Sequence, residues 1–398
     1  MTGAKGAARS APHIATLVLI SGLAALSLNV FLPSLPGMAR HFEVDYATMQ
    51  LSVSAYLGVG ALMQLASGPI SDLFGRRPVM LVALVVFLLA TIGTVFAPDA
   101  QSFLAFRLTQ AVITAGFVIS RAMVRDLVTG ENAASLLGYV TMGMSIVPMI
   151  APVFGGILDE AFGWQANFVL MGACGLAVFL LCWFDLGETA QVSSQPFKSQ
   201  LSSYGALARS GLFWGYAATI TLASGSFFAY LGGAPFVGSE VFNLTSSQVG
   251  YWFAAPSLGY ALGNYISGRF AMRIGMRHLI TAGVLVSTVA LGLAFLADLS
   301  GLHQPLIFFG SVAALGLGNG LLLPSANAGM MSVRPELAGT AAGLGGAMSV
   351  AGGAALAALA GALLHDDSGA LPLLAVMLAS AVASVATVIY TLNRSKRP

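Results

Sequence analysis

The best-defined group of charged side chains in this sequence lies between residues 68 and 78, Gly-Pro-Ile-Ser-Asp-Leu-Phe-Gly-Arg-Arg-Pro. Asp72 can accept hydrogen bonds from a helix N-terminus or form an ion pair with an arginine, and Arg76 and Arg77 follow closely. Gly68 and Gly75 allow a sharp turn and let neighbouring helices approach. We therefore expect a tight, charged turn that acts as a conformational latch. Two alternatives remain: the segment is a simple basic loop, or Asp72 carries a proton.

A second group surrounds Arg107 in the apolar segment 103–111, with Gln110 three residues later. An arginine inside a membrane is costly and normally faces a cavity. It keeps its proton, so it can attract an anionic or dipolar substrate or act on a nearby acid, but it cannot carry protons. The alternative is a side chain that reaches a helix end about one turn away.

Asp126 is the other candidate proton carrier, because it follows Arg125 and lies five residues after Arg121. An ion-pair partner at the membrane surface is the favoured interpretation of Asp126, and a proton carrier is the alternative.

Composition places all these groups in a membrane protein. Of the 398 residues, 57% are hydrophobic and 8% are charged, against about 45–50% and about 25% in soluble proteins. The net charge of +2 does not suggest nucleic-acid binding, and two cysteines are too few for a metal cluster. The sequence contains no HExxH, GxSxG or GxxxxGK[ST] motif, so we expect no enzyme, no ATPase, no cofactor and no metal site.

The apolar segments predict an all-α protein with twelve membrane-spanning helices. These are expected at residues 14–36, 47–67, 78–97, 103–124, 133–158, 166–186, 212–238, 248–268, 278–297, 305–327, 338–361 and 371–392. The polar segment after residue 186 divides the chain into a six-helix half (1–186), a linker (187–211) and a second six-helix half (212–398).

The two halves share faint repeats at an offset of 200 residues. Ser67 and Gly68 correspond to Ser267 and Gly268, Gly75 to Gly275 and Arg77 to Arg277. Both copies follow the second span of their half, which predicts two pseudo-symmetric halves of the same orientation.

The positions of basic residues predict the orientation in the membrane. With the N-terminus inside, all of the 17 basic residues except Arg40, Arg107 and Arg121 lie on the cytoplasmic side. We therefore expect both termini in the cytoplasm of a cell whose inner (plasma) membrane holds the protein.

Three motifs resemble the major facilitator superfamily. They are the charged turn at 68–78, the Arg107–Gln110 segment, and a fifth-helix motif with Gly143, Pro148, Pro152, Gly155 and Gly156. Prolines kink this helix and glycines let a neighbour pack closely, so it is expected to bend or rock against the eighth span, or simply to pack as a kinked helix. The resemblance implies a transporter with the major-facilitator fold.

The segment from Leu28 to Pro36 and the pair Arg125–Asp126 resemble the drug:proton antiporter branch that includes bicyclomycin-resistance proteins and phenicol exporters. Those relatives often have a carboxylate where this chain has Asn29. Asparagine does not titrate near neutral pH, so any proton coupling must use another residue.

The expected substrate cavity contains polar and aromatic side chains from spans of both halves, which suits a mostly apolar ligand. These residues are Asn29, Tyr56, Gln64, Arg107, Gln110, Arg121, Phe227, Tyr230, Asn264, Asn319 and Asn327. The resemblance implies export of small amphipathic or apolar drugs by alternating access, with the proton gradient as energy source. The alternative is a facilitator or importer of a neutral metabolite without proton coupling. Substrate, protons and membrane lipid are the expected partners.

Overall fold

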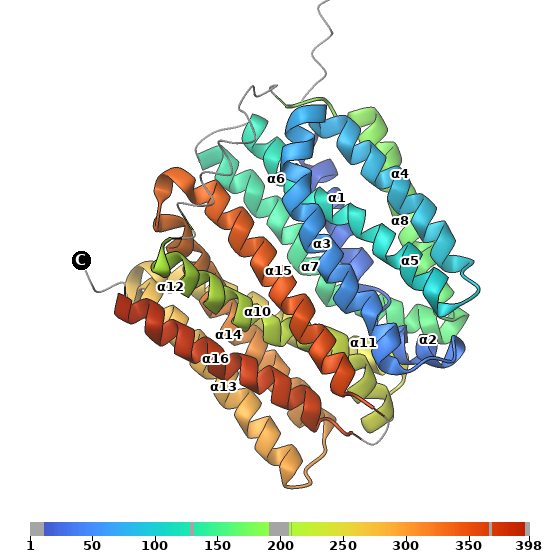
Figure 1. The fold of residues 1–398 in the computed structure, drawn as a ribbon, viewed down its shortest axis with the longest axis vertical. Coiled ribbons are helices and arrows are strands. Elements are labelled where there is room, and N and C mark those ends of the chain that lie inside the picture. Colours follow the sequence, from blue (N-terminus) through green and yellow to red (C-terminus); the bar gives the residue numbers. More distant parts are fainter. Residues whose placement is uncertain (1–11, 128–130, 191–206, 208, 366–367, 395–398) are drawn as a thin grey trace, which may run out of the picture.

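The structure, a computed structural model, describes residues 12–127, 131–190, 207, 209–365 and 368–394. Among them, helices form six membrane-length segments in each half, which confirms the expected twelve-helix fold (Figure 1). Ten of the segments are long and apolar enough to cross a membrane by length and composition. The remaining two are α7 and the pair formed by α11 and α12.

The first half contains α1 (Ile14–Asn29), α2 (Leu35–His41), α3 (Tyr46–Phe74), α4 (Arg76–Val95), α5 (Ala100–Gln110), α6 (Ala115–Leu127), α7 (Glu131–Phe162) and α8 (Gln165–Asp185). The second contains α10 (Gly211–Phe236), α11 (Ser246–Trp252), α12 (Ala254–Ile274), α13 (Met276–Leu299), α14 (Pro305–Ser332), α15 (Ala338–Leu363) and α16 (Leu371–Arg394). Most of the predicted linker, residues 191–206 and 208, lies outside the described residues.

Three spans expected to be continuous are interrupted. The first is divided by a 3₁₀ turn, η1 (Leu32–Ser34), and the fourth by η2 (Ala111–Thr114). Pro33 and Pro36 explain the first break, because proline lacks the backbone N–H that a continuous helix needs. The eighth span changes from α11 to α12 at Phe253.

Side-chain caps start several helices at the expected loops. Asp45 accepts a hydrogen bond from the Thr48 N–H (3.1 Å) at the start of α3. Asp99 accepts one from the Ser102 N–H (2.8 Å) at the start of α5, and this bond is the main reason why the pKa of Asp99 is lowered. These caps satisfy amide groups that have no partner inside the helix.

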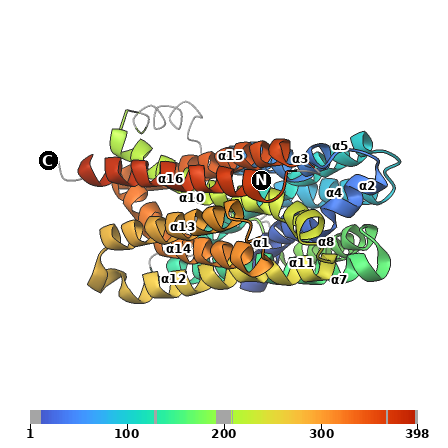
Figure 2. The same cartoon turned by 90° about the horizontal axis from the view of Figure 1, so that it is seen from below.

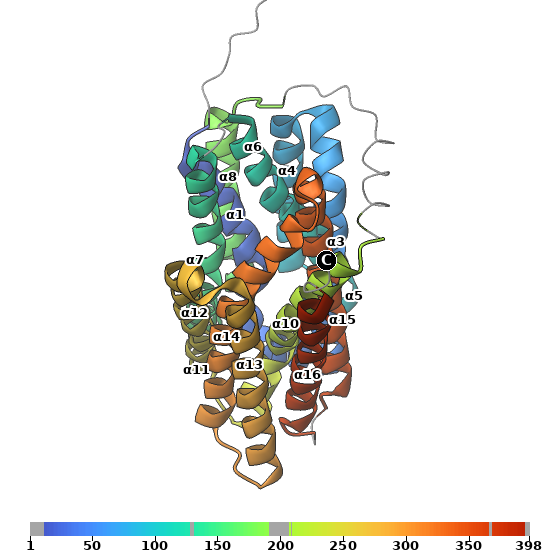
Figure 3. The ribbon, with the colours of Figure 1, turned by 90° about the vertical axis from the view of Figure 1, so that its left-hand side faces the viewer.

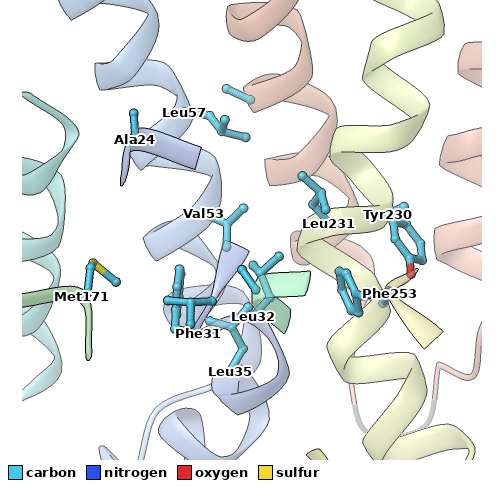
Figure 4. Packing of buried hydrophobic residues seen from close by; sticks show 14 of the residues in the cluster. Ala24, Phe31, Leu32, Leu35, Val53, Leu57, Met171, Tyr230, Leu231 and Phe253 are labelled. Carbon is cyan, nitrogen blue, oxygen red and sulfur yellow. The ribbon is translucent and has the colours of Figure 1, made fainter. Parts of the chain in front are cut away.

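Because each half has an even number of spans, α1 begins and α16 ends on the same side of the bundle, here called the terminal face. The other side is the opposite face. The two halves are separate groups of helices in Figures 2 and 3, and α3 of the first half packs against α15 of the second. A continuous apolar cluster joins them: Figure 4 shows Phe31 and Val53 of the first half in the same cluster as Leu231 and Phe253 of the second.

Candidate functional site

A cavity of about 350 Å³ lies between the two halves. Its wall comes from α1, α3, α6 and α7 on one side and from α10, α14 and α15 on the other. Most wall residues are apolar, among them Phe117, Phe227 and Phe228. A cavity with these walls can hold a small, largely apolar molecule.

The structure places six of the predicted cavity residues on this wall: Asn29, Tyr56, Gln64, Arg121, Phe227 and Asn327. Sequence analysis missed Thr114, Ser224 and Ser349, which also line the cavity. Small hydroxyl residues are common in membrane helices, so their type alone carries little signal.

Arg107 and Gln110 do not line the cavity but lie directly behind it. The Arg107 guanidinium donates to the carbonyl oxygens of Ser27 (2.7 Å) and Ser52 (3.2 Å) and to Gln110 Oε1 (2.8 Å). Its Cζ lies 3.9 Å from the ring centroid of Tyr56, which does line the cavity. The arginine is fully buried, so its guanidinium is not exposed at the membrane surface.

The other three predicted cavity residues also lie elsewhere. Tyr230 is fully buried and packs on Phe253, with ring centroids 5.0 Å apart. Asn319 donates to the Ala223 carbonyl oxygen (3.2 Å) across the helix contact of α14 and α10. Asn264 lies on α12 where that helix packs closely on Gly320 of α14.

Asn29 occupies the last position of α1 and is almost completely buried. Its Nδ2 donates to the Ala25 carbonyl oxygen (2.7 Å). Its Oδ1 is buried and has no hydrogen-bond partner within the described part of the chain. A buried acceptor without a partner is costly, so this oxygen is available to a donor on a bound molecule.

The cavity is closed toward the opposite face by hydrogen bonds between the halves. Tyr46 donates to the Gly232 carbonyl oxygen (2.6 Å), one residue beyond Leu231 of the cavity wall. Gln50 Nε2 donates to the Ala357 carbonyl oxygen (2.8 Å). Farther out, Arg40 forms an ion pair with Glu240 (2.6 Å).

The fifth-helix motif lies at two close helix contacts. A Cβ at Gly155 would overlap the Val30 carbonyl oxygen, where the first span breaks. A Cβ at Gly156 would overlap the Ser246 backbone of α11, and one at Gly250 would overlap the Pro152 carbonyl oxygen. Gly155 therefore lets α7 pack against the first span, and Gly156 lets it pack against α11 of the second half. Pro148 lines the cavity, and Gly143 lies in the same helix.

Polar groups strengthen the contact between α7 and α11. Ser246 Oγ donates to Asp159 Oδ2 (2.6 Å), and the Ser247 N–H donates to Glu160 Oε1 (2.9 Å). The two acids at the end of α7 thus face the N-terminal turn of α11, where negative charge is favourable.

The charged segment 68–78 differs from the expected turn, because α3 continues to Phe74 and includes Gly68, Pro69 and Asp72. The turn itself is Gly75, whose φ is +93°. This backbone conformation favours glycine.

Arg76 is the centre of a charged cluster at the terminal face, which also contains Asp72 and Asp126. It pairs with Asp72 (2.5 Å) and with Asp126 (3.1 Å) and donates to Ser71 Oγ (2.6 Å). Both candidate proton carriers therefore contact the same guanidinium. The Arg77 guanidinium instead donates to the Trp183 carbonyl oxygen of α8 (3.0 Å).

Glu188 was missed by sequence analysis. Its carboxylate accepts hydrogen bonds from the backbone N–H groups of Arg76 (2.9 Å) and Arg77 (3.2 Å) at the start of α4. The residue lies more than 100 positions from them in sequence, so no local pattern indicates this contact.

The described residues contain no group of three or more His, Cys, Asp or Glu side chains that could hold a metal ion. The site is thus an apolar cavity with a few polar side chains, closed toward the opposite face, and a charged cluster at the terminal face.

The family model of the Major Facilitator Superfamily matches residues 17–246 and 233–398. The chain is 30% identical over 361 residues to multidrug resistance protein D of Escherichia coli (strain K12), covering 90% of both chains. It is 25% identical over 396 residues to a bicyclomycin resistance protein homolog of Haemophilus influenzae, covering 96% of both. A crystal structure of a bacterial homolog to the human lysosomal transporter Spinster, inward-facing and unoccupied, has a TM-score of 0.72 at 17% identity, over 96% of this chain and 94% of that one. At this identity the structural likeness shows the fold alone.

Proposed function

Because the chain belongs to the Major Facilitator Superfamily, we propose that it exports small amphipathic or apolar compounds, drugs among them, across the inner membrane in exchange for protons. The observation that carries the proposal is the apolar cavity between the halves, closed toward the opposite face. Relatives named for multidrug and bicyclomycin resistance support drugs as the substrate class.

The transport mechanism is alternating access. The terminal face is cytoplasmic, as the basic residues predict, and the structure corresponds to the state that receives substrate from the cytoplasm. Arg121 and Gly346 line the cavity and are exposed, while Tyr46 and Gln50 close its other end. Opening to the outside requires these contacts to break while α7 moves against α11 near Gly156.

Coupling to protons must use residues outside the cavity wall, since no Asp or Glu is among its described residues. Asp126 and Asp72 remain the candidates. Protonation of either acid removes its ion pair with Arg76, which would loosen the contact between α3, α4 and α6. Proton binding would thereby favour the change between states.

Efflux from energised cells tests the proposal. Cells that produce the protein are loaded with a radiolabelled phenicol, and its loss is measured with and without a protonophore. We expect protonophore-sensitive efflux that the variant Gly156→Leu abolishes, because leucine would collide with the Ser246 backbone. Gly343→Ala is the matched control, since nothing lies within 4 Å of a Cβ there. Efflux equal to that of cells without the protein would contradict drug export.

The alternative is a facilitator or importer of a neutral metabolite, and one observation favours it: Asn29 offers no titratable group in the cavity. Substrate flux that follows only the substrate gradient, unchanged by protonophore, would support this alternative over the antiporter.

A further inference from the structure

The charge of the cavity wall has one sign. Among its described residues Arg121 has the only formal charge, and there is no carboxylate. Arg121 is exposed, so water screens its charge, whereas a charge buried behind the apolar wall is weakly screened.

A second positive charge lies immediately behind the wall. Arg107 is fully buried, and within the described residues its guanidinium pairs with carbonyl, amide and hydroxyl oxygens rather than with an acid. These dipoles satisfy its hydrogen bonds but do not remove its net charge. The guanidinium Cζ lies 3.9 Å from the ring centroid of Tyr56, which lines the cavity.

The aromatic rings nearest to Arg107 offer little to a cationic ligand. Aromatic faces normally attract cations. Here the guanidinium already lies over the rings of Tyr56 (3.9 Å) and Phe31 (4.4 Å). Phe117, Phe227 and Phe228 contribute apolar surface instead, and Asn29 Oδ1 offers a buried acceptor.

We infer that the cavity selects neutral or anionic amphipathic compounds with a hydroxyl or amide N–H donor, and rejects lipophilic cations. The inference rests on the proposed function, which it narrows to one charge class of substrate. The donor binds Asn29 Oδ1, the apolar body contacts the phenylalanines, and negative charge gains from the buried Arg107.

Three probes with the same naphthalene body and one hydroxyl donor each test it: one with a carboxy(hydroxy)methyl group, one with a hydroxyethyl group and one with a (2-hydroxyethyl)dimethylammoniomethyl group. Binding to the full-length protein in lipid nanodiscs is measured by equilibrium dialysis. We expect the cation to bind at least about tenfold more weakly than the other two, the difference that about 1.4 kcal/mol produces. If the cationic probe binds as tightly as the other two probes, or more tightly, the inference is overturned and the proposed function stays intact.

A pair of variants at one wall position sharpens the test. Ser224→Asp adds a carboxylate to the cavity and should bring the cation to at least the affinity of the anion. Ser224→Asn has nearly the same size without the charge and should keep the wild-type order of the probes. If the three probes have the same order of affinity in both folded variants, the inference is overturned. If Ser224→Asp does not fold, the wild-type order decides alone. No binding of any probe to the wild type would overturn both the inference and the proposed export of amphipathic compounds.

Discussion

Two equivalent turns, one in each half, have the same backbone but different side chains. Gly75 joins α3 to α4 with φ of +93°, and Gly275 joins α12 to α13 with φ of +84°. At the offset of 200 residues, Met272 replaces Asp72 and Met276 replaces Arg76. The repeat therefore preserves the turn, and only the first copy contains the ion pair.

The surroundings differ accordingly. In the first half, Arg76 binds Asp126 at the end of α6, and Glu188 binds the start of α4. In the second half, Met272 is 97% exposed, and within the described part of the chain the Arg277 guanidinium donates a hydrogen bond of 3.4 Å to the Leu392 carbonyl oxygen at the end of α16. The comparison indicates that the charged cluster is a specific device of the first half, whereas the glycine turn belongs to the shared fold.

Arg76→Met gives the first turn the residue found at the equivalent position of the second, and it should have the largest effect. It leaves the partly buried Asp72 and Asp126 without their partner, which should cost about 2–3 kcal/mol, less than for a fully buried pair. We expect transport to fall by about tenfold or more and thermal stability to fall with it. Met276→Ala is the control and should change transport less than twofold, about 0.4 kcal/mol. Equal losses in both variants would show that the cluster has no special role.

Alanine at the two glycines should separate backbone strain from side-chain contact. Both positions have positive φ, so each alanine should cost about 1 kcal/mol in unfolding free energy. At Gly75 a Cβ would also meet the Glu188 carboxylate, whereas at Gly275 the nearest group is the His278 ring at 3.9 Å. Gly75→Ala should therefore lower the melting temperature more than Gly275→Ala. The reverse order in a thermal-shift assay would contradict the described contact.

Glu188→Gln should have the smallest effect. Glutamine keeps one acceptor for the N–H groups at the start of α4 but loses the negative charge favoured there. We expect a loss of about 0.3–1 kcal/mol, measured by thermal unfolding, that becomes smaller at high salt. A loss as large as that of Arg76→Met would make Glu188, rather than Arg76, the centre of the cluster.

Sequence analysis predicted the fold because hydrophobic length alone determines most membrane spans. It also predicted the equivalence of Gly75 and Gly275 from a few repeated residues. It placed the end of α3 too early, at residue 67, because Gly68 and Pro69 are typical of turns in soluble proteins, whereas this helix tolerates both.

The candidate site was less predictable. Six of the eleven cavity candidates line the wall. Arg107 is buried behind the wall, and Tyr230 is buried away from it. The difference depends on which side of each helix faces the other half. Helices buried on most sides have apolar residues all round, so their sequences give no clear direction. Glu188 could not be found because its contact depends on tertiary structure.

The central proposal is that this chain exchanges a drug for protons although it has Asn29 where the resemblance implies a carboxylate. The most direct test measures phenicol movement and internal pH together in proteoliposomes of the purified protein under an imposed proton gradient. The account predicts drug-dependent proton flux in the opposite direction, lost in Arg76→Met. Drug movement without any proton flux would contradict it and identify the chain as a facilitator.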